Sequence, residues 1–326
     1  MIKRIVSYFL KLVLILAAIV VLFYFWGSSA TMEKSEYKKV IVNNYEVEKM
    51  SDSIFSIVTY NIGYLSGMTN NTAQDRPKEL VDSNLVHVKK LFKKLNVDFI
   101  AFQEIDYNSK RSFQVNQEDE ISKLGYNHVA RTVNWDKKYV PFPYFPPSAH
   151  FGQVVSGQSI LSKYEIIKHD RIVLDRVENT PFFKNAFYLD RLLQITKINV
   201  NGKELILMNV HLEAFDKETR VKQLKNVVEI FKQYSQSKPT ILLGDFNSDP
   251  NFEDPAIAQV LNLDNIGNAA FLKDNFANTF DAENPYKRLD YIFYSEQFIE
   301  YVNGDVLEEF GQASDHLPVL MKFKFK

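Results

Sequence analysis

The feature that most restricts the fold of this chain is a series of apolar, strand-like segments that run directly into polar side chains. The clearest example is ILLGDFNSDP (241–250), in which an apolar run reaches Gly244 and is followed by Asp245 and Asn247. Side chains at positions i and i+2 of a strand point to the same side. Both polar groups should therefore project together from one strand end, which suits a metal or phosphate site better than a packed core.

Six strand-like segments of the chain show this pattern. Taken singly, each polar residue has an ordinary explanation, such as a turn asparagine, a core histidine, or an ion pair of Glu104 with Lys89 or of Asp290 with Arg288. Taken together, they predict one polar site at the strand ends. The residues are Asn61 in TYNIG, Glu104 in FQEID, His211 in NVHLE, Asp245 and Asn247 in GDFN, Asp290 in RLDYI, and Asp315 with His316 in SDHLP.

The segments between these motifs predict a layered fold. Apolar residues recur at helical spacing in 81–95 and again in 221–231, which indicates two amphipathic helices. SILSKYEIIKHDRIVL (159–174) is interpreted as one strand, and two further strands flank a hairpin turn at Asn201–Gly202. Many strands with a few interspersed helices are typical of an α/β (α+β) sandwich.

The amino terminus predicts a membrane segment. Residues 12–30 carry no charge, and about 20 such residues suffice to span a bilayer. Lys3, Arg4 and Lys11 precede this run, so the positive-inside rule places the amino terminus in the cytoplasm and the rest of the chain outside. The alternative is a cleaved signal peptide, because SSA before Thr31 resembles a small-residue cleavage site, and the protein would then be secreted.

The sequence therefore predicts three parts. Residues 1–30 form a membrane anchor or a signal peptide, residues 31–53 form a linker with one short strand, and residues 54–326 form a single domain. The chain has no cysteine, so any metal must be held by oxygen or imidazole ligands. A net charge of −1 gives no basic footprint for nucleic acid, which makes that class of partner less favoured.

The ordered motif series TYNIG, FQEID, NVHL, GDFN, RLDYI and SDHLP resembles the endonuclease/exonuclease/phosphatase superfamily over residues 54–325. The resemblance implies a four-layer αββα sandwich with two mostly antiparallel sheets. It also implies Mg²⁺-dependent cleavage of phosphoester bonds, with Mn²⁺ or another divalent cation as alternatives. Mg²⁺ prefers oxygen ligands and binds through one or two carboxylates, which matches the residue types present. The metal residues implied are Glu104, Asn61 and Asp315.

The same resemblance implies roles for the remaining strand-end residues. Asp245 is the candidate base, held by Asn247. His316, oriented by Asp290, is an alternative base or, when protonated, a phosphate-binding group, since imidazole titrates near neutral pH. His211 would donate to a non-bridging phosphate oxygen as charge develops there.

Four further residues are candidate substrate contacts. Arg111 follows Glu104 and Arg220 lies on the helix after NVHL; each is either a phosphate contact or part of a solvated surface. Tyr144 and Phe145 belong to an aromatic, proline-rich loop (137–151) that suits a membrane interface or folds back onto the domain.

We expect a monomeric, anchored, extracytoplasmic phosphodiesterase that acts on a membrane lipid or its headgroup, as neutral sphingomyelinases and lipid-remodelling relatives do. The alternatives are an extracytoplasmic nuclease of the deoxyribonuclease I type and a non-catalytic binding protein on the same scaffold. The intact set of acids and histidines argues against the last of these.

Overall fold

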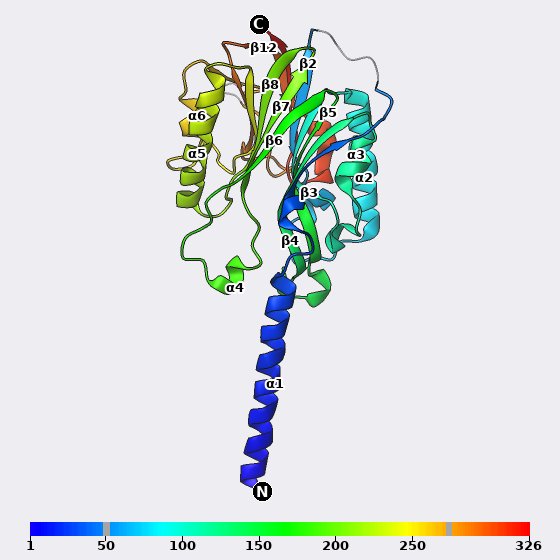
Figure 1. Cartoon of the computed structure of the whole chain (residues 1–326), viewed down its shortest axis with the longest axis vertical. Coiled ribbons are helices and arrows are strands. Elements are labelled where there is room, and N and C mark those ends of the chain that lie inside the picture. The colour runs from blue at the N-terminus through cyan, green and yellow to red at the C-terminus, as the bar shows by residue number, and fades with distance from the viewer. Residues whose placement is uncertain (48–52, 272–275) are drawn as a thin grey trace.

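The computed structural model describes residues 1–47, 53–271 and 276–326. Two β-sheets pack face to face and helices cover the outer face of each, which gives the layer order α-β-β-α (Figure 1). One outer layer contains α2 (Lys78–Leu95) and α3 (Gln117–Ser122), and the other contains α5 (Lys217–Ser235) and α6 (Ala258–Leu261). The predicted α+β sandwich is confirmed.

The larger sheet has seven strands in the order β1-β4-β5-β3-β2-β13-β12. Neighbouring strands run antiparallel, except that β2 and β3 are parallel. The strands are β1 (Lys38–Val42), β2 (Phe55–Asn61), β3 (Phe99–Asp106), β4 (His128–Val140), β5 (Gly152–Ser162), β12 (Ile299–Val306) and β13 (Val319–Phe325).

The smaller sheet has six strands in the order β10-β11-β9-β8-β7-β6. Here β8 and β9 form the parallel pair, and the other neighbours are antiparallel. The strands are β6 (Glu165–Val173), β7 (Leu192–Val200), β8 (Lys203–His211), β9 (Thr240–Asp245), β10 (Ile266–Asn268) and β11 (Asp290–Ser295). Each sheet thus places one parallel pair near its centre.

Three apolar clusters hold the layers together. One lies between the two sheets and includes Ile57, Ile160 and Leu207, all fully buried. A second joins the larger sheet to α2, and a third joins the smaller sheet to α5 and α6. Complete burial of such a side chain contributes roughly 1.5–3 kcal/mol. The helices predicted in 81–95 and 221–231 are confirmed as α2 and α5. Their apolar residues at helical spacing lie on the faces that pack against the sheets.

The segment 159–174 was predicted as one strand, and this is wrong. It contributes the end of β5 to the larger sheet and all of β6 to the smaller one. The chain changes sheet at residues 163–164, where the backbone N–H of Lys163 donates to the carbonyl oxygen of Asp98. The Asn201–Gly202 hairpin is confirmed: both residues have positive φ, and Val200 pairs with Lys203.

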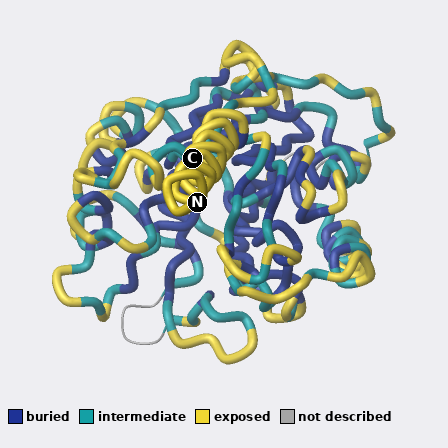
Figure 2. Tube along the Cα trace, turned by 90° about the horizontal axis from the view of Figure 1, so that it is seen from below, coloured by how far each residue is buried: buried dark blue, intermediate teal, exposed yellow. Residues whose placement is uncertain are grey.

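The amino-terminal segment forms a 27-residue helix, α1 (Ile2–Ser28), that projects from one end of the sandwich (Figure 1). It is long and apolar enough to cross a membrane, and its 18-residue apolar window has no residue buried in the protein. Seen from the side of α1, the helix is exposed while the strands behind it are largely buried (Figure 2).

Residues that follow α1 lie against the sandwich. The predicted short strand of segment 31–53 is β1, and it pairs with β4 at the edge of the larger sheet. The backbone N–H and the hydroxyl of Thr31 donate to Asp136 Oδ1, at 2.8 and 2.6 Å. Residues 48–52 of this segment lie outside the described residues.

Candidate active site

The polar strand ends meet where the two parallel pairs finish side by side, one pair from each sheet. Asn61 ends β2 and Asp245 ends β9, and the Asn61 Nδ2 donates to Asp245 Oδ2 at 2.9 Å. This hydrogen bond joins the two sheets at residues 184 positions apart. The contact brings the TYNIG and GDFN motifs together at one end of the sandwich.

Glu104 reaches the site through a local irregularity of β3. The pairing of β3 with β5 shifts register between Phe102 and Ile105, and Glu104 has a φ of 52°. A bulge of this kind redirects a side chain that would otherwise point into a sheet face. The Glu104 carboxylate accepts a hydrogen bond from Asn70 Nδ2 at 3.0 Å, and the same nitrogen lies 3.2 Å from Asp315 Oδ1. Two carboxylates therefore converge on one point.

Asp245 is held by the turn that follows β9. The backbone N–H of Asn247 donates to Asp245 Oδ1 at 2.8 Å, and the Asn247 amide donates to the carbonyl oxygen of Leu212 at 3.0 Å. Gly244, with a φ of 135°, permits this arrangement, because a Cβ at that position would lie 2.0 Å from the carbonyl oxygen of Val210. Only glycine allows β8 and β9 to approach so closely just before the acid.

His316 and Asp290 form a buried pair. The His316 Nδ1 lies 2.8 Å from Asp290 Oδ2, and Nε2 faces Asp245 Oδ2 at 3.9 Å. Burial by itself lowers the pKa of His316, but the Asp290 and Asp245 carboxylates outweigh it and raise that pKa well above its usual value. The protonated imidazolium is thus the favoured form, which can donate from Nε2 toward the site.

His211 has the opposite electrostatic environment. Its Nε2 lies 2.6 Å from Arg191 Nη1, so it accepts a hydrogen bond from the guanidinium. Burial, followed by the charges of Arg191 and His316, lowers the pKa of His211 well below its usual value. Arg191 is itself paired with Glu213, whose carboxylate also accepts from the Tyr188 hydroxyl at 2.9 Å.

The residues present fit a divalent cation. Burial, and next the charge of Asp315, raise the pKa of Glu104 to about 7, and burial with Asp290 raises that of Asp245 to about 6. Buried carboxylates that repel one another in this way are stabilised by a bound cation. A second possible ligand group consists of Asp245, Asp290 and His316, whose ligand atoms lie within 4.8 Å of one another. Since His316 Nδ1 is already committed to Asp290, the Glu104–Asp315 pair fits a hard cation better.

The expectation for Arg111 is corrected. Both sequence interpretations assumed an accessible side chain, but Arg111 is buried and its guanidinium donates to both oxygens of Asp106, at 3.1 and 2.8 Å. The guanidinium also lies 3.2 Å from the ring centroid of Tyr64. Aromatic residues from distant segments cover it, so it stabilises the fold beside the site.

The other predicted substrate residues differ in accessibility. Arg220 is buried, and its Nη1 donates to the carbonyl oxygens of Glu213 and Ala214, which fixes the turn after β8. Tyr144 and Phe145 are strongly exposed at the tip of the loop between β4 and β5. Their contacts with substrate stay a prediction.

Two residues of the site, Arg191 and Asn70, were not predicted from the sequence. Arg191 directly precedes β7, and because β7 is antiparallel to β8, the start of β7 lies beside the end of β8. An arginine immediately before an apolar strand becomes informative only once the antiparallel pairing of β7 with β8 is known. Asn70 lies just after a short 3₁₀ turn (Gly67–Thr69) and matches no motif.

Comparison with known proteins agrees with this geometry. Residues 58–316 match the Endonuclease/Exonuclease/phosphatase family, and the chain belongs to that family. No curated protein matched the sequence. Members of the family are hydrolases that act on phosphoester bonds and generally use a divalent metal.

Solved structures share the fold at low sequence identity. An endonuclease/exonuclease/phosphatase from Beutenbergia cavernae has a TM-score of 0.62 and 18% identity, over 84% of this chain and 72% of its own. The catalytic domain of human Nocturnin with bound sulfate has a TM-score of 0.59 and 16% identity, over 89% and 98%. A mannosyl-6-phosphatase from Bacteroides thetaiotaomicron has a TM-score of 0.56 and 16% identity, over 83% and 99%. These likenesses establish the fold alone.

Proposed function

We propose that this chain is a membrane-anchored, Mg²⁺-dependent phosphodiesterase that hydrolyses the phosphoester of a lipid headgroup on the extracytoplasmic side of the membrane. The observation that carries the proposal is the packing of the last turns of α1 against the end of the domain where the site lies. The last residues of β4 lie at this end and contact α1, and His128 at the start of β4 lies at the opposite end. A lipid substrate in the same bilayer would face the end of the domain that holds the site.

Contacts of α1 with the domain favour a retained anchor over a cleaved signal peptide. The backbone N–H of Lys138 donates to the carbonyl oxygen of Ser29 at 2.9 Å, and Lys137 Nζ donates to that of Ser28 at 3.0 Å. The rings of Trp26 and Tyr139 lie 6.2 Å apart. Cleavage before Thr31 would remove all three contacts. Lys3, Arg4 and Lys11 support a cytoplasmic amino terminus.

The site residues support in-line attack by water on phosphorus. Asp245 is assigned as the acceptor of the water proton, because Asn61 and Asn247 hold its two oxygens in place. Protonated His316 is assigned to donate to a phosphoryl oxygen, and Asp290 fixes its orientation. Arg191 adds a positive charge beside His211. A divalent cation held by Glu104 and Asp315, with Asn61 nearby, would supply polarisation of the phosphoryl group and stabilisation of the leaving oxygen.

The test is a substrate comparison with the full chain in lipid nanodiscs. Choline phospholipid including sphingomyelin, plasmid DNA and bis(4-nitrophenyl) phosphate are each incubated with Mg²⁺ or with chelator. The proposal expects Mg²⁺-dependent release of phosphorylated headgroup and little cleavage of DNA. Cleavage of DNA without turnover of lipid would replace the proposal with the nuclease alternative, and no turnover of any phosphoester would support a binding protein.

A further inference from the structure

Two exposed aromatic tips flank the end of α1 that meets the domain. One is the loop between β4 and β5, where Phe145 is 79% exposed next to Tyr144. The other is α4 (Phe182–Asn185), where Phe182 is 73% exposed and Phe183 about half exposed. Both tips lie at the end of the sandwich from which α1 projects (Figure 1). Exposed aromatic side chains gathered at one end of a domain indicate a contact surface.

A small apolar core connects the segments that carry the two tips. Trp135 and Val140 of β4 pack with Phe151 of the loop and with Leu189, which follows α4. The Trp135 Nε1 also donates to the carbonyl oxygen of Phe187 at 2.9 Å. These contacts hold the bases of the two segments next to each other.

Aromatic contacts tie α1 to both tips. The ring of Tyr24 lies 5.9 Å from that of Phe182, and Phe23 lies 5.6 Å from Tyr139 at the base of the loop. Phe182 and the base of the β4–β5 loop therefore lie level with Phe23 and Tyr24 along the helix axis. The depth of α1 in a bilayer consequently sets the depth of the tips.

The length of α1 then places the tips at the membrane interface. The charge-free part of the helix begins at Leu12 and the helix ends at Ser28. With a rise of 1.5 Å per residue this part is about 25 Å long, which is slightly less than the hydrocarbon thickness of about 30 Å. If Lys11 remains at the inner interface, with its side chain extended toward water, no length of helix is left to hold the domain away from the bilayer.

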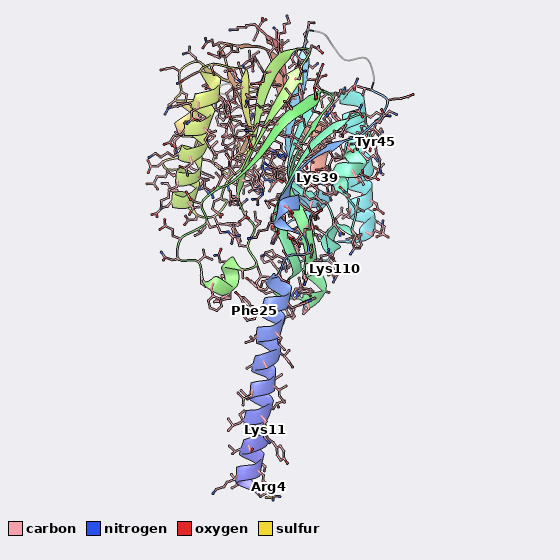
Figure 3. The ribbon with its side chains drawn as sticks, viewed as in Figure 1. Arg4, Lys11, Phe25, Lys39, Tyr45 and Lys110 are labelled. Atoms are coloured by element: carbon pink, nitrogen blue, oxygen red, sulfur yellow. The ribbon has the colours of Figure 1, made fainter. Side chains whose placement is uncertain are left out.

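We propose that this end of the domain rests directly on the outer surface of the bilayer that holds α1, with Tyr144–Phe145 and Phe182–Phe183 inserted into the interface as two feet beside the helix. Two exposed lysines lie near these aromatic residues. Lys184 belongs to α4, and the side chain of Lys110 lies beside Gly152, where the β4–β5 loop ends. Lys110 is labelled at this end of the domain in Figure 3. Such lysines suit the phosphate groups of the lipid surface. The inference rests on the membrane anchoring in the proposed function. It would place the active site near the phospholipids of the bilayer that holds α1.

The absence of cysteine in the chain permits a direct test by single labels. Phe145→Cys and Phe183→Cys report on the two feet. Leu14→Cys, on the exposed part of α1, reports insertion of the anchor. Val42→Cys is the matched control, because Val42 is exposed and pairs with His128 at the far end of β4. Each labelled full-length protein is reconstituted in proteoliposomes with an environment-sensitive fluorophore, and its thermal unfolding confirms that it is folded.

The readout is quenching by a spin-labelled lipid compared with quenching by aqueous iodide. We expect the lipid quencher to lower emission from the Phe145 and Phe183 labels about twofold or more, as for groups at the headgroup–acyl boundary, and iodide to quench only the Val42 label. Foot labels that respond like Val42 while Leu14 is quenched by lipid would overturn the inference and leave the anchor. Foot labels protected from both quenchers would indicate a protein partner and also overturn it. A Leu14 label that lipid fails to quench would refute the anchor itself; none of these results depends on hydrolysis.

Discussion

His316 Nδ1 and Asp290 Oδ2 lie 2.8 Å apart, and this pair directs the second ring nitrogen of His316 toward Asp245. The pair joins β11 to the segment before β13, so elements of both sheets orient one imidazole. A protonated histidine held in this way can donate a hydrogen bond at a fixed position, which stabilises negative charge that develops on a phosphoryl oxygen.

Removing either member of this pair should impair turnover without unfolding the domain. We expect His316→Ala and Asp290→Asn each to lower kcat by about 10²- to 10³-fold. The first removes the hydrogen-bond donor to the phosphoryl oxygen, and the second removes the carboxylate that orients the imidazole and stabilises its positive charge. The measurement is hydrolysis of bis(4-nitrophenyl) phosphate with Mg²⁺. Asp305→Asn, an exposed acid on β12, is the matched control and should keep full activity. Full activity in His316→Ala would refute the role assigned to this histidine.

Asn70 provides a test of the metal site that does not depend on catalysis. Its Nδ2 contacts Glu104 and Asp315, and its buried Oδ1 has no partner among the described residues. We expect Asn70→Ala to weaken Mg²⁺ or Mn²⁺ affinity roughly 10- to 100-fold, as for other groups that orient metal ligands. Titration calorimetry on the full chain measures this. Gln74→Ala, exposed four residues further on, should change nothing; unchanged or tighter metal binding in Asn70→Ala would show that the amide only fills the cation position.

His169 should make the stability of the domain depend on pH. Its Nε2 accepts from the Gln194 amide at 3.1 Å, and burial, followed by the charge of Lys38, lowers its pKa to about 4. The folded state therefore favours neutral imidazole. Its stabilising contribution is complete above the unfolded pKa of about 6.5 and is lost as the pH falls toward 4, because the unfolded chain binds the extra proton.

The size of this effect is up to about 3 kcal/mol of unfolding free energy. Denaturant unfolding between pH 8 and pH 4 measures it, and His169→Gln should give a flatter profile than the parent protein over that window. His87→Gln is the control, since His87 is exposed on α2. Equal pH profiles for the parent and His169→Gln would contradict the assignment.

The ion pair of Arg111 with Asp106 should matter for stability more than for substrate binding. Both side chains are buried, and removing the cation leaves an unpaired carboxylate in the interior. We expect Arg111→Met to lower the unfolding free energy by about 3–5 kcal/mol, measured by denaturant unfolding. Lys110→Met, the exposed neighbour, should cost little. A large rise in KM for Arg111→Met with unchanged stability would restore the phosphate-binding interpretation.

The strand-end residues could be predicted from sequence because the signal is local. An apolar run that stops at Asn61, Glu104 or Asp245 predicts both a buried strand and a polar side chain at its carboxyl end. Asn70 and Arg191 could not be found in this way, since Asn70 follows a short turn and Arg191 stands at the start of a strand. Their place in the site depends on which strands pair and in which direction.

Burial of polar residues was the other property that local sequence did not reveal. IDYNSKRSF has the composition of an exposed turn, yet Arg111 is covered by Tyr64, Trp135 and Phe151 from three other segments. The change of sheet at residues 163–164 was also hidden, because no glycine or proline separates the end of β5 from the start of β6.

The central claim is that Glu104, Asp245, Asn247 and His316 form one metal-dependent phosphoester hydrolase site, and a single comparison tests it most directly. Hydrolysis of bis(4-nitrophenyl) phosphate by the full chain is measured with Mg²⁺, with excess chelator, and with Glu104→Gln. The account predicts turnover with Mg²⁺, none with chelator until Mg²⁺ is restored, and none in a folded Glu104→Gln protein. Equal turnover in all three conditions would contradict it.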